Sequence, residues 1–329
     1  MKKALITGAA GSVGYYLAQE LLKEGYELVL TDNLQRGKKD ERFLKLLDDP
    51  RLRFIELDLT DPASYPELGG GYDQVYHLAA VNGTKLFYQM PHEVLRINTL
   101  SLIYMLEWFK DHSAEGKFCF TSSNEAYAGA LESFGQLPLP TPEEVPLVIS
   151  DPYNPRWSYG STKLIGELFV IHYAQQYQFK AVIVRPHNFY GPRSGYDHVI
   201  PELCQRALAK ADPFDLYGPE QTRAFCHLKD AARAMRLLME SSKTDGQPVE
   251  TVHIGSPEEV TMETLAEKVF SAGGWRPQAI RRKEPPKGSV ARRVADIRKI
   301  RELVGWEPEI SLDEGLKETF AWYAANPKT

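Results

Sequence analysis

A glycine-rich segment close to the N-terminus, TGAAGSVG at residues 7–14, constrains the fold of this chain more than any other feature. The apolar run from Ala4 to Ile6 predicts a strand before it, and the pattern from Val13 to Lys23 predicts a helix after it. Glycines at such a junction let the backbone approach a pyrophosphate, and the helix N-terminus offers free N–H groups. The segment therefore predicts a dinucleotide site. Its expected contacts are Gly8, Gly11, Ser12, Val13 and Gly14.

Short apolar runs alternate with helical patterns through the first half of the chain. Such alternation gives a parallel sheet covered on both faces, with ligands bound beyond the carboxyl ends of its strands. Beyond Pro186 the pattern becomes irregular, which indicates a second, smaller lobe. The expected fold is α/β, a Rossmann-like doubly wound parallel sheet with a smaller C-terminal α/β substrate lobe. Further strands are expected at 28–30, 54–57, 75–78, 117–121 and 181–184, long helices at 93–112 and 158–178, and a proline-rich loop at 137–155.

Two acidic residues close neighbouring strands of the predicted sheet. Asp32 ends the second strand, 24 positions after Gly8. A carboxylate there accepts hydrogen bonds from ribose hydroxyls and repels a 2′-phosphate, so the predicted cofactor is NAD rather than NADP. Arg36 and Lys38 follow closely and could soften this preference. Asp58, at the end of the third strand, is a candidate for the adenine edge.

A tyrosine and a lysine stand four residues apart in YGSTK, at 159–163, on a predicted helix. Side chains at this spacing share a helix face, so the Lys163 ammonium can sit beside the Tyr159 phenol, or beside the ribose that also orders it. To act as a base near pH 7, a tyrosine must have its pKa lowered from about 10 to about 7, which takes roughly 4 kcal/mol. A lysine charge at about 4 Å supplies on the order of 4 kcal/mol, so the two energies match. Tyr159 is therefore the predicted base. Ser123 and Glu125, at the end of the fifth strand, complete the predicted catalytic group.

Composition excludes several other classes of protein. The 329 residues carry a net charge of −5, without the basic stripe that a nucleic-acid surface needs. The three cysteines form no C-x-x-C pair, so inert thiols are expected, with no metal site. No apolar stretch approaches the ~20 residues of a membrane span, and glycines interrupt the N-terminal apolar run, so we expect no membrane association, no signal peptide and a cytoplasmic location.

Taken together, the motifs resemble those of the extended short-chain dehydrogenase/reductases, specifically the NAD-dependent nucleotide-sugar epimerase/dehydratase branch. The resemblance covers nearly the whole chain. Its marks are TGAAGSVG at 7–14, TDN at 31–33, HLAA at 77–80, Asn98, YGSTK at 159–163, RPHNFYGPR at 185–193, QTRAF at 221–225 and GWEP at 305–308.

The resemblance implies an NAD-binding Rossmann domain at 1–185 plus about 226–256, and a nucleotide-sugar-binding lobe at 186–225 and 257–329. Ser123 and Tyr159 would polarise the C4 hydroxyl of the sugar, with Lys163 supporting Tyr159. Asn98 would help to order the active-site helix. The implied substrate contacts are Asn188, Arg193, Arg223 and Arg293, with Arg292 left open as an alternative to Arg293. Further implied cofactor contacts are Asn33, Leu59, Leu78, Ala79, Ala80, Asn98, Tyr159, Lys163 and Pro186.

The implied chemistry is redox-neutral: Tyr159 takes the O4 proton while C4 gives hydride to NAD⁺, and a 4-keto sugar forms. C4 epimerisation of a UDP-hexose or UDP-hexuronate is the first expectation, and UDP-glucuronate decarboxylation or 4,6-dehydration is the alternative. The related 4,6-dehydratases carry Thr-Asp-Glu where this chain has Ser123-Asn124-Glu125, and asparagine cannot be the acid that expels the C6 hydroxyl. The related decarboxylases share Glu125 and Arg293, so the outcome stays open, as do the nucleotide and the sugar.

Two further hypotheses are a 4-keto-sugar reductase and a non-catalytic NAD-binding sensor or scaffold. Scaffolds of this kind usually lose the tyrosine or the lysine, and both are present here. The resemblance also implies a homodimer joined through the two long helices. The apolar residues offered for that interface are Tyr104, Met105, Trp108, Phe109, Phe169, Val170 and Tyr173.

Overall fold

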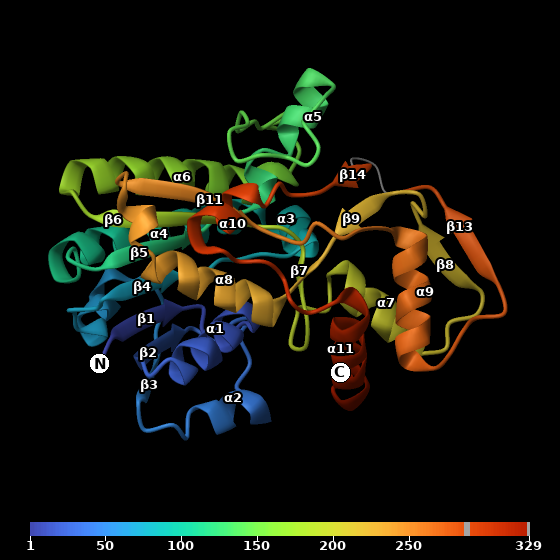
Figure 1. Cartoon of the computed structure of the whole chain (residues 1–329), viewed down its shortest axis with the longest axis horizontal. Coiled ribbons are helices and arrows are strands. Elements are labelled where there is room, and N and C mark those ends of the chain that lie inside the picture. Colours follow the sequence, from blue (N-terminus) through green and yellow to red (C-terminus); the bar gives the residue numbers. More distant parts are fainter. Residues whose placement is uncertain (286–289, 328–329) are drawn as a thin grey trace.

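Seven parallel strands form the central sheet of the computed structural model, which describes residues 1–285 and 290–327. Their order is β11-β6-β5-β4-β1-β2-β3, so the direction of winding reverses between β1 and β4 (Figure 1). Such a reversal opens a crevice at the carboxyl ends of the two strands. The expected doubly wound α/β fold is confirmed. The strands are β1 (Lys3–Thr7), β2 (Glu27–Asp32), β3 (Leu52–Glu56), β4 (Gln74–His77), β5 (Lys117–Thr121), β6 (Lys180–Pro186) and β11 (Val249–Ile254).

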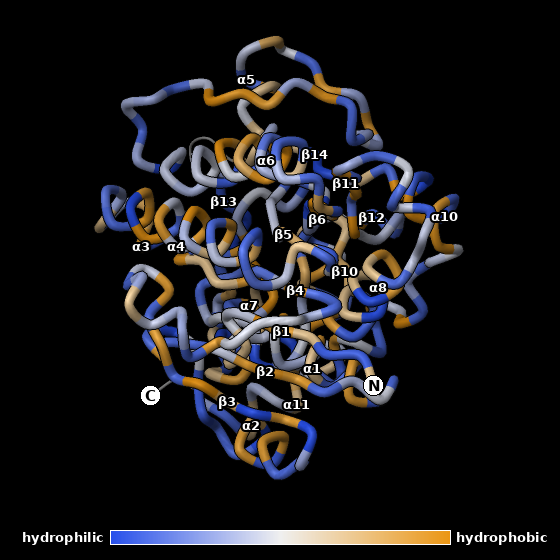
Figure 2. The backbone as a smooth tube through the Cα atoms, turned by 90° about the vertical axis from the view of Figure 1, so that its left-hand side faces the viewer, coloured by the Kyte–Doolittle hydropathy of each residue, from blue (hydrophilic) through white to orange (hydrophobic). Residues whose placement is uncertain are grey.

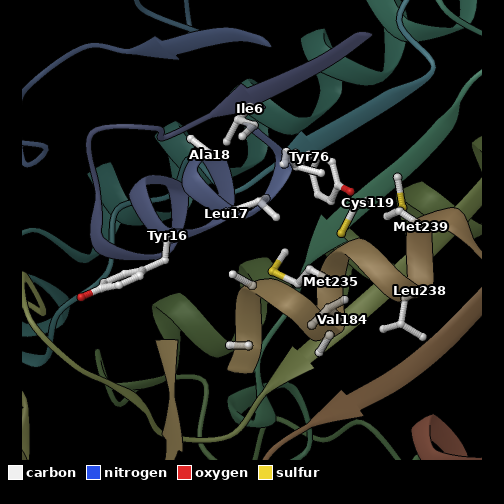
Figure 3. Packing of buried hydrophobic residues seen from close by; sticks show 14 of the residues in the cluster. Ile6, Tyr16, Leu17, Ala18, Tyr76, Cys119, Val184, Met235, Leu238 and Met239 are labelled. Carbon is white, nitrogen blue, oxygen red and sulfur yellow. The ribbon is translucent and has the colours of Figure 1, made fainter. Parts of the chain in front are cut away.

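Helices cover both faces of this sheet, which is why its strands are almost continuously apolar. In Figure 2 the tube is largely orange along β1 and β2. On one face lie α1 (Ser12–Lys23) and α8 (Leu228–Glu240), and Figure 3 shows Leu17 of α1 and Met235 of α8 packed over Ile6, Tyr76 and Val184. On the other face lie α4 (Pro91–His112) and α6 (Trp157–Tyr177), which match the two long helices predicted.

A second apolar core lies beside the sheet domain, at the right of Figure 1. Its residues come from the segments assigned to the substrate lobe, but Ala295, Ile297, Ile300 and Trp306 of 257–329 pack in the core of the sheet domain, so the predicted division stays a prediction. Residues 286–289 and 328–329 lie outside the described residues. The elements of this lobe are α7 (Val199–Leu208), β8 (Phe214–Tyr217), β9 (Thr222–Ala224), β12 (Glu259–Thr261), α9 (Met262–Gly273), β13 (Ile280–Lys283), β14 (Arg292–Arg293) and α11 (Leu312–Ala325).

Shorter elements complete the structure, and some of them, such as α2 (Glu41–Leu46) and α10 (Arg298–Val304), pack in the core of the sheet domain. Residues 128–156 leave the sheet domain after β5, and α5 stands away from the body in Figure 1 and in Figure 2. The loop predicted at 137–155 contains no helix or strand. The remaining elements are α3 (Thr84–Gln89), α5 (Gly129–Phe134), β7 (Phe189–Tyr190) and β10 (Cys226–His227). Among residues 1–285 and 290–327, no helix is both long and apolar enough to cross a membrane.

The outer faces of α4 and α6 differ from the apolar face expected for a dimer. Met105, Trp108, Phe109 and Val170 are buried against the sheet, because they lie on the stripe of each helix that faces it. The other three residues offered for the interface, Tyr104, Phe169 and Tyr173, are half-buried. The exposed apolar side chains of the two helices are instead Leu95, Ile165, Leu168 and Tyr177.

A buried ion pair lies between α6 and β6. Both nitrogens of Arg185 that face Glu167 donate to its carboxylate at 2.8 Å, and the two side chains are 6% and 2% exposed. Ser122 donates to the same carboxylate at 2.5 Å, and Arg185 also donates to the Glu143 carbonyl at 2.8 Å. The pair therefore fixes the end of β5 to α6, close to Ser123, which belongs to the predicted catalytic group.

Removal of one partner should be costly, because the other charge then stays buried without compensation. We expect Glu167→Ala to lower the free energy of unfolding by about 3–5 kcal/mol in urea denaturation. Glu202→Ala is a matched control, since that side chain is 59% exposed and lies 3.8 Å from Arg206. Equal effects of the two substitutions would contradict a structural role for the buried pair.

Candidate active site

One cavity of about 810 Å³ runs along the carboxyl edge of the sheet and reaches the second lobe. Its walls are formed by the glycine-rich loop, the ends of β2, β4 and β5, the first turn of α6 and the strands that carry Arg223 and Arg293. Every residue predicted for the site lines this cavity except Asn98. Residues that are far apart in the sequence are thus brought together at the crevice that the strand order creates.

The glycine-rich loop is packed too tightly for side chains. A Cβ on Gly8 would lie 2.9 Å from the Ala79 backbone, and one on Gly14 would lie 2.6 Å from the Gly8 carbonyl oxygen. Gly8 also has φ +66°, a conformation that favours glycine. No side chain caps α1 at Gly11, so the first N–H groups of the helix are left for a ligand. The loop therefore fits a pyrophosphate, as the dinucleotide hypothesis requires.

Asp32 stands at the wall of the cavity where the ribose is expected. Its carboxylate accepts hydrogen bonds from the N–H groups of Leu34 at 2.8 Å and Ala10 at 3.1 Å. Burial raises the pKa of Asp32, and the two N–H donors oppose that rise. Asp58 also lines the cavity, but its Oδ1 accepts from the backbone and hydroxyl of Thr60 at 2.9 Å, as a turn residue does.

Arg193 lines the cavity, but its guanidinium is engaged with the cofactor half of the site. It forms an ion pair with Asp40 and donates to the carbonyl oxygens of Ala10 at 2.9 Å and Lys38 at 3.2 Å. The guanidinium also lies 4.6 Å from the centre of the Tyr15 ring, and only 3% of the side chain is exposed. The substrate contact predicted for Arg193 stays a prediction, whereas its contacts in the structure tie the second lobe to the glycine-rich loop.

Asn98 lies behind the cavity wall. Its side chain accepts from the Val81 N–H at 2.7 Å and donates to the Val81 carbonyl at 3.1 Å and the Thr162 hydroxyl at 3.2 Å. These bonds connect α4 and the segment after β4 with the helix that carries Tyr159. The arrangement agrees with the ordering role inferred for Asn98, and the predicted contact with the cofactor remains a prediction.

Tyr159, Lys163 and Ser123 meet at the centre of the cavity. Tyr159 and Lys163 lie on α6 and are 8% and 4% exposed, and the Lys163 nitrogen is 5.4 Å from the centre of the Tyr159 ring. Ser123, at the end of β5, hydrogen-bonds the phenol. Phe87 of α3 stacks on the other side of the phenol ring, with centroids 5.1 Å apart and planes at 13°. The phenol is thus held rigidly beside a hydroxyl and an amine.

The electrostatics of this pair differ from the sequence-based expectation. Burial raises the pKa of Tyr159, with the nearby Glu125 charge adding to the rise and the Ser123 hydrogen bond opposing it. Burial also lowers the pKa of Lys163 to about 7, although Glu167 opposes the change. The lysine nitrogen donates to the Thr121 carbonyl at 2.8 Å rather than to the phenol. The chain alone therefore keeps the phenol protonated, because desolvation and the Glu125 charge outweigh the Ser123 hydrogen bond and the Arg36 charge.

Glu125 forms an ion pair with an arginine from the second lobe. Arg293 donates to Glu125 Oε1 at 2.9 Å and to the Asn124 side-chain oxygen at 3.4 Å. Burial by itself would raise the pKa of Glu125, but the charges of Arg293 and Arg156 bring it below its usual value. Arg292 points elsewhere and pairs with Glu259 at 2.6 Å, so Arg293 is the member of the Arg292–Arg293 pair that lines the cavity.

Arg223 and Asn188 complete the second-lobe side of the site. Arg223 is paired in register with Arg293 across β9 and β14, and it donates to the Thr222 carbonyl at 2.7 Å. Burial, followed by repulsion from Arg293, lowers the pKa of Arg223 to about 10, so this guanidinium favours an anionic neighbour. Asn188 has φ +44° and donates to the Ala224 carbonyl at 2.9 Å. The side of the cavity formed by this lobe is thus strongly cationic.

Many residues of the cavity wall were not among the predicted ones, and Phe87, Arg156 and Trp322 are three of them. Arg156 had a signal in the sequence, because it precedes Tyr159 by three positions and shares its helix face. Phe87 and Trp322 had none, since α3 and α11 approach the cavity only through the tertiary fold.

Comparison with known proteins places this geometry in context. The model of the NAD dependent epimerase/dehydratase family matches residues 4–255. The chain is 30% identical to the UDP-N-acetyl-alpha-D-glucosaminuronate decarboxylase of Bacillus cytotoxicus, over 98% of each chain, and 29% identical to a putative UDP-glucose 4-epimerase of Methanocaldococcus jannaschii, over 99% of each. The crystal structure of the Thermotoga maritima UDP-glucose 4-epimerase with UDP-glucose superposes with a TM-score of 0.83, at 27% identity, and the match covers 99% of this chain and 100% of the other.

The lowered pKa of Lys163 predicts a pH-dependent contribution to stability. Between about pH 7 and the ordinary lysine value, the unfolded chain binds one proton more than the folded chain, so this group makes stability rise with pH. The measured quantity is the free energy of unfolding of the wild type minus that of Lys163→Met, both without added cofactor. We expect this difference to increase by about 1 kcal/mol per pH unit from pH 7.5 to 9.5. Parallel profiles for the two proteins in urea titrations would show that Lys163 is not desolvated.

Proposed function

This chain is a member of the NAD-dependent epimerase/dehydratase family, and we propose that it decarboxylates a nucleotide-linked hexuronate by way of a transient 4-keto sugar. The observation that carries the proposal is the half-buried Glu125–Arg293 ion pair at the sugar end of the cavity. The Bacillus cytotoxicus relative, whose name is that of a hexosaminuronate decarboxylase, supports the same choice. Arg223 and Arg293 would hold the diphosphate of the substrate, since paired guanidiniums suit phosphate oxygens.

The first step of the proposed reaction is oxidation at C4. When bound, NAD supplies the hydride acceptor for this carbon and a positive ring beside the phenol. Ser123 and Tyr159 would hold O4 by hydrogen bonds, and Tyr159 would take its proton. Lys163, whose pKa of about 7 lets it carry or release a proton at neutral pH, would act with the phenol. The desolvated pocket keeps the phenol neutral until substrate and cofactor are both in place.

The second step is the loss of CO₂. A 4-keto hexuronate is a β-keto acid, so the C5–C6 bond can break with its electron pair moving through C5 to O4. CO₂ leaves, C5 takes a proton, and C4 regains its hydride, which yields a sugar that is one carbon shorter. The hydrogen-bond donors at O4 would stabilise the enolate charge. The ionised Glu125 would disfavour a neighbouring carboxylate and thereby favour its departure as neutral CO₂.

An ionised Glu125 also weighs against 4,6-dehydration. That reaction needs an acid to protonate the departing C6 hydroxyl. The two arginines lower the pKa of Glu125, and the adjacent Asn124 has no proton to give. C4 epimerisation, the first expectation from the sequence, is the second candidate. The likeness to the named 4-epimerases of Methanocaldococcus jannaschii and Thermotoga maritima favours it. A scaffold finds no comparable support, because Tyr159 and Lys163 are both retained. A reductase would differ from both candidates by a stoichiometric loss of absorbance at 340 nm.

Product analysis separates these outcomes. We expect incubation with a panel of UDP-, dTDP- and GDP-linked hexuronates and hexoses to release CO₂ from one hexuronate and to give a nucleotide-linked pentose by NMR, without net change in absorbance at 340 nm. Tyr159→Phe should keep bound NAD and lose at least ~10³-fold in kcat, in the range of general base catalysis. A C4-inverted product with no loss of carbon would instead establish the second candidate.

Glu125→Gln tests the role of the ion pair in the same assay. The amide keeps the shape and removes the charge, so we expect kcat for CO₂ release to fall by about 10²-fold, with a much smaller effect on KM. Glu132→Gln, on the exposed part of α5, is the control. Unchanged CO₂ release by Glu125→Gln would remove the main support for decarboxylation.

We also propose that this protein is cytoplasmic and that it forms homodimers through α4 and α6. The exposed Leu95, Ile165 and Leu168 support this interface. Light scattering after size exclusion should give twice the chain mass of 37.2 kDa. Ile165→Glu should give the single-chain mass, whereas Val199→Glu, a similarly exposed position on α7, should leave the dimer intact. A monomeric wild type would refute the proposal.

A further inference from the structure

Arg156 lines the sugar end of the cavity, and none of the roles assigned above uses it as a ligand for substrate. It directly precedes α6, where Asn154 accepts a hydrogen bond from its N–H at 3.1 Å and starts the helix. Its guanidinium lies 5.4 Å from the centre of the buried Trp157 ring, and 20% of its side chain is exposed. The side chain is therefore held in one place before any ligand arrives.

The position of Arg156 is set relative to the catalytic phenol. Arg156 and Tyr159 are three residues apart, which puts them on one face of the helix and about 4.5 Å apart along its axis. Gly160 lets this turn press against the end of β5, since a Cβ there would lie 2.9 Å from the Glu125 carbonyl oxygen. If the Tyr159 phenol lies at C4 of the sugar, the Arg156 guanidinium, about one helical turn away, lies near the substituents of C5.

The charges around Arg156 point to a carboxylate as its ligand. Its guanidinium is 3.7 Å from Glu125 Oε2, while Arg293 holds the other oxygen of the same carboxylate at 2.9 Å. The three side chains together carry one positive charge in excess. A neutral hydroxymethyl group at C5 would not balance that charge, whereas one further carboxylate would.

Arg156 is also separate from the two arginines suited to the diphosphate. Arg223 and Arg293 are register partners on β9 and β14 in the second lobe, whereas Arg156 belongs to the sheet domain. Arg156 faces the same carboxylate as Arg293 but comes from the start of α6, so a third guanidinium matches a third anionic group of the substrate, distinct from its two phosphates.

We propose that Arg156 is the specificity residue that recognises the C6 carboxylate of a hexuronate substrate. This inference rests on the proposed function for the placement of C4 at Tyr159. Because Arg156 already faces Glu125, it recognises the carboxylate by charge without holding it in a full bidentate grip. The substrate's carboxylate can thus be selected at binding and still leave as CO₂.

Binding without turnover tests this role. In the Tyr159→Phe background with NAD bound, calorimetry would compare UDP-, dTDP- and GDP-glucuronate with the matching nucleotide glucoses. We expect at least one glucuronate to bind about tenfold or more tightly than its neutral partner, as one charge-assisted contact implies. Arg156→Gln should remove this preference and leave the affinity for the glucose form within about twofold. Arg156→Lys should retain part of the preference, and the exposed Arg276→Gln should change nothing.

Other results would overturn the proposal. Absence of any glucuronate preference, or a preference that survives in Arg156→Gln, would show that Arg156 does not recognise the carboxylate. An equal loss of affinity for both sugars would make it a general anchor or a structural residue, which NAD content and thermal midpoint would reveal. Failure of the proposed function looks different: the Arg156-dependent preference would persist in binding while the wild-type enzyme formed no pentose.

Discussion

Parallel strand pairing is the constraint on which the rest of this molecule depends. Because all seven strands run in one direction, the segments that follow β1, β2, β4, β5 and β6 emerge at one edge of the sheet. The reversal of winding between β1 and β4 then separates the covering helices and leaves a crevice there. Neither the glycine-rich loop nor the Tyr159 helix could form the site alone. They meet because the sheet requires it.

Desolvation dominates the chemistry of this crevice. It raises the pKa of Tyr159 and lowers that of Lys163 to about 7, so the phenol is neutral and the amine only partly charged near neutral pH. Charges are retained where opposite charges face them, as at Glu125 with Arg293 and at Glu167 with Arg185. The site thus combines a neutral centre with charged walls. Such an arrangement leaves the catalytic proton transfers to depend on ligands that bring their own charge.

Local patterns in the sequence predicted what depends on neighbours along the chain. The glycine-rich loop, the position of Asp32 after β2 and the shared face of Tyr159 and Lys163 follow from short-range geometry, and all of them line the cavity. The side-chain partners could not be predicted in this way. Arg193 and Asn98 form contacts that depend on where the second lobe and α4 pack. Lys163 donates to the Thr121 carbonyl rather than to the phenol. The choice between Arg292 and Arg293 depended on strand orientation at β14.

The contacts of Arg193 link the second lobe to the glycine-rich loop and the segment after β2. Its guanidinium joins Asp40 and the carbonyls of Ala10 and Lys38 from across the cavity mouth. A movement that separated the second lobe from the glycine-rich loop would break these contacts, which involve a side chain that is only 3% exposed. One buried side chain thus couples the placement of the second lobe to the shape of the loop on the far side of the cavity.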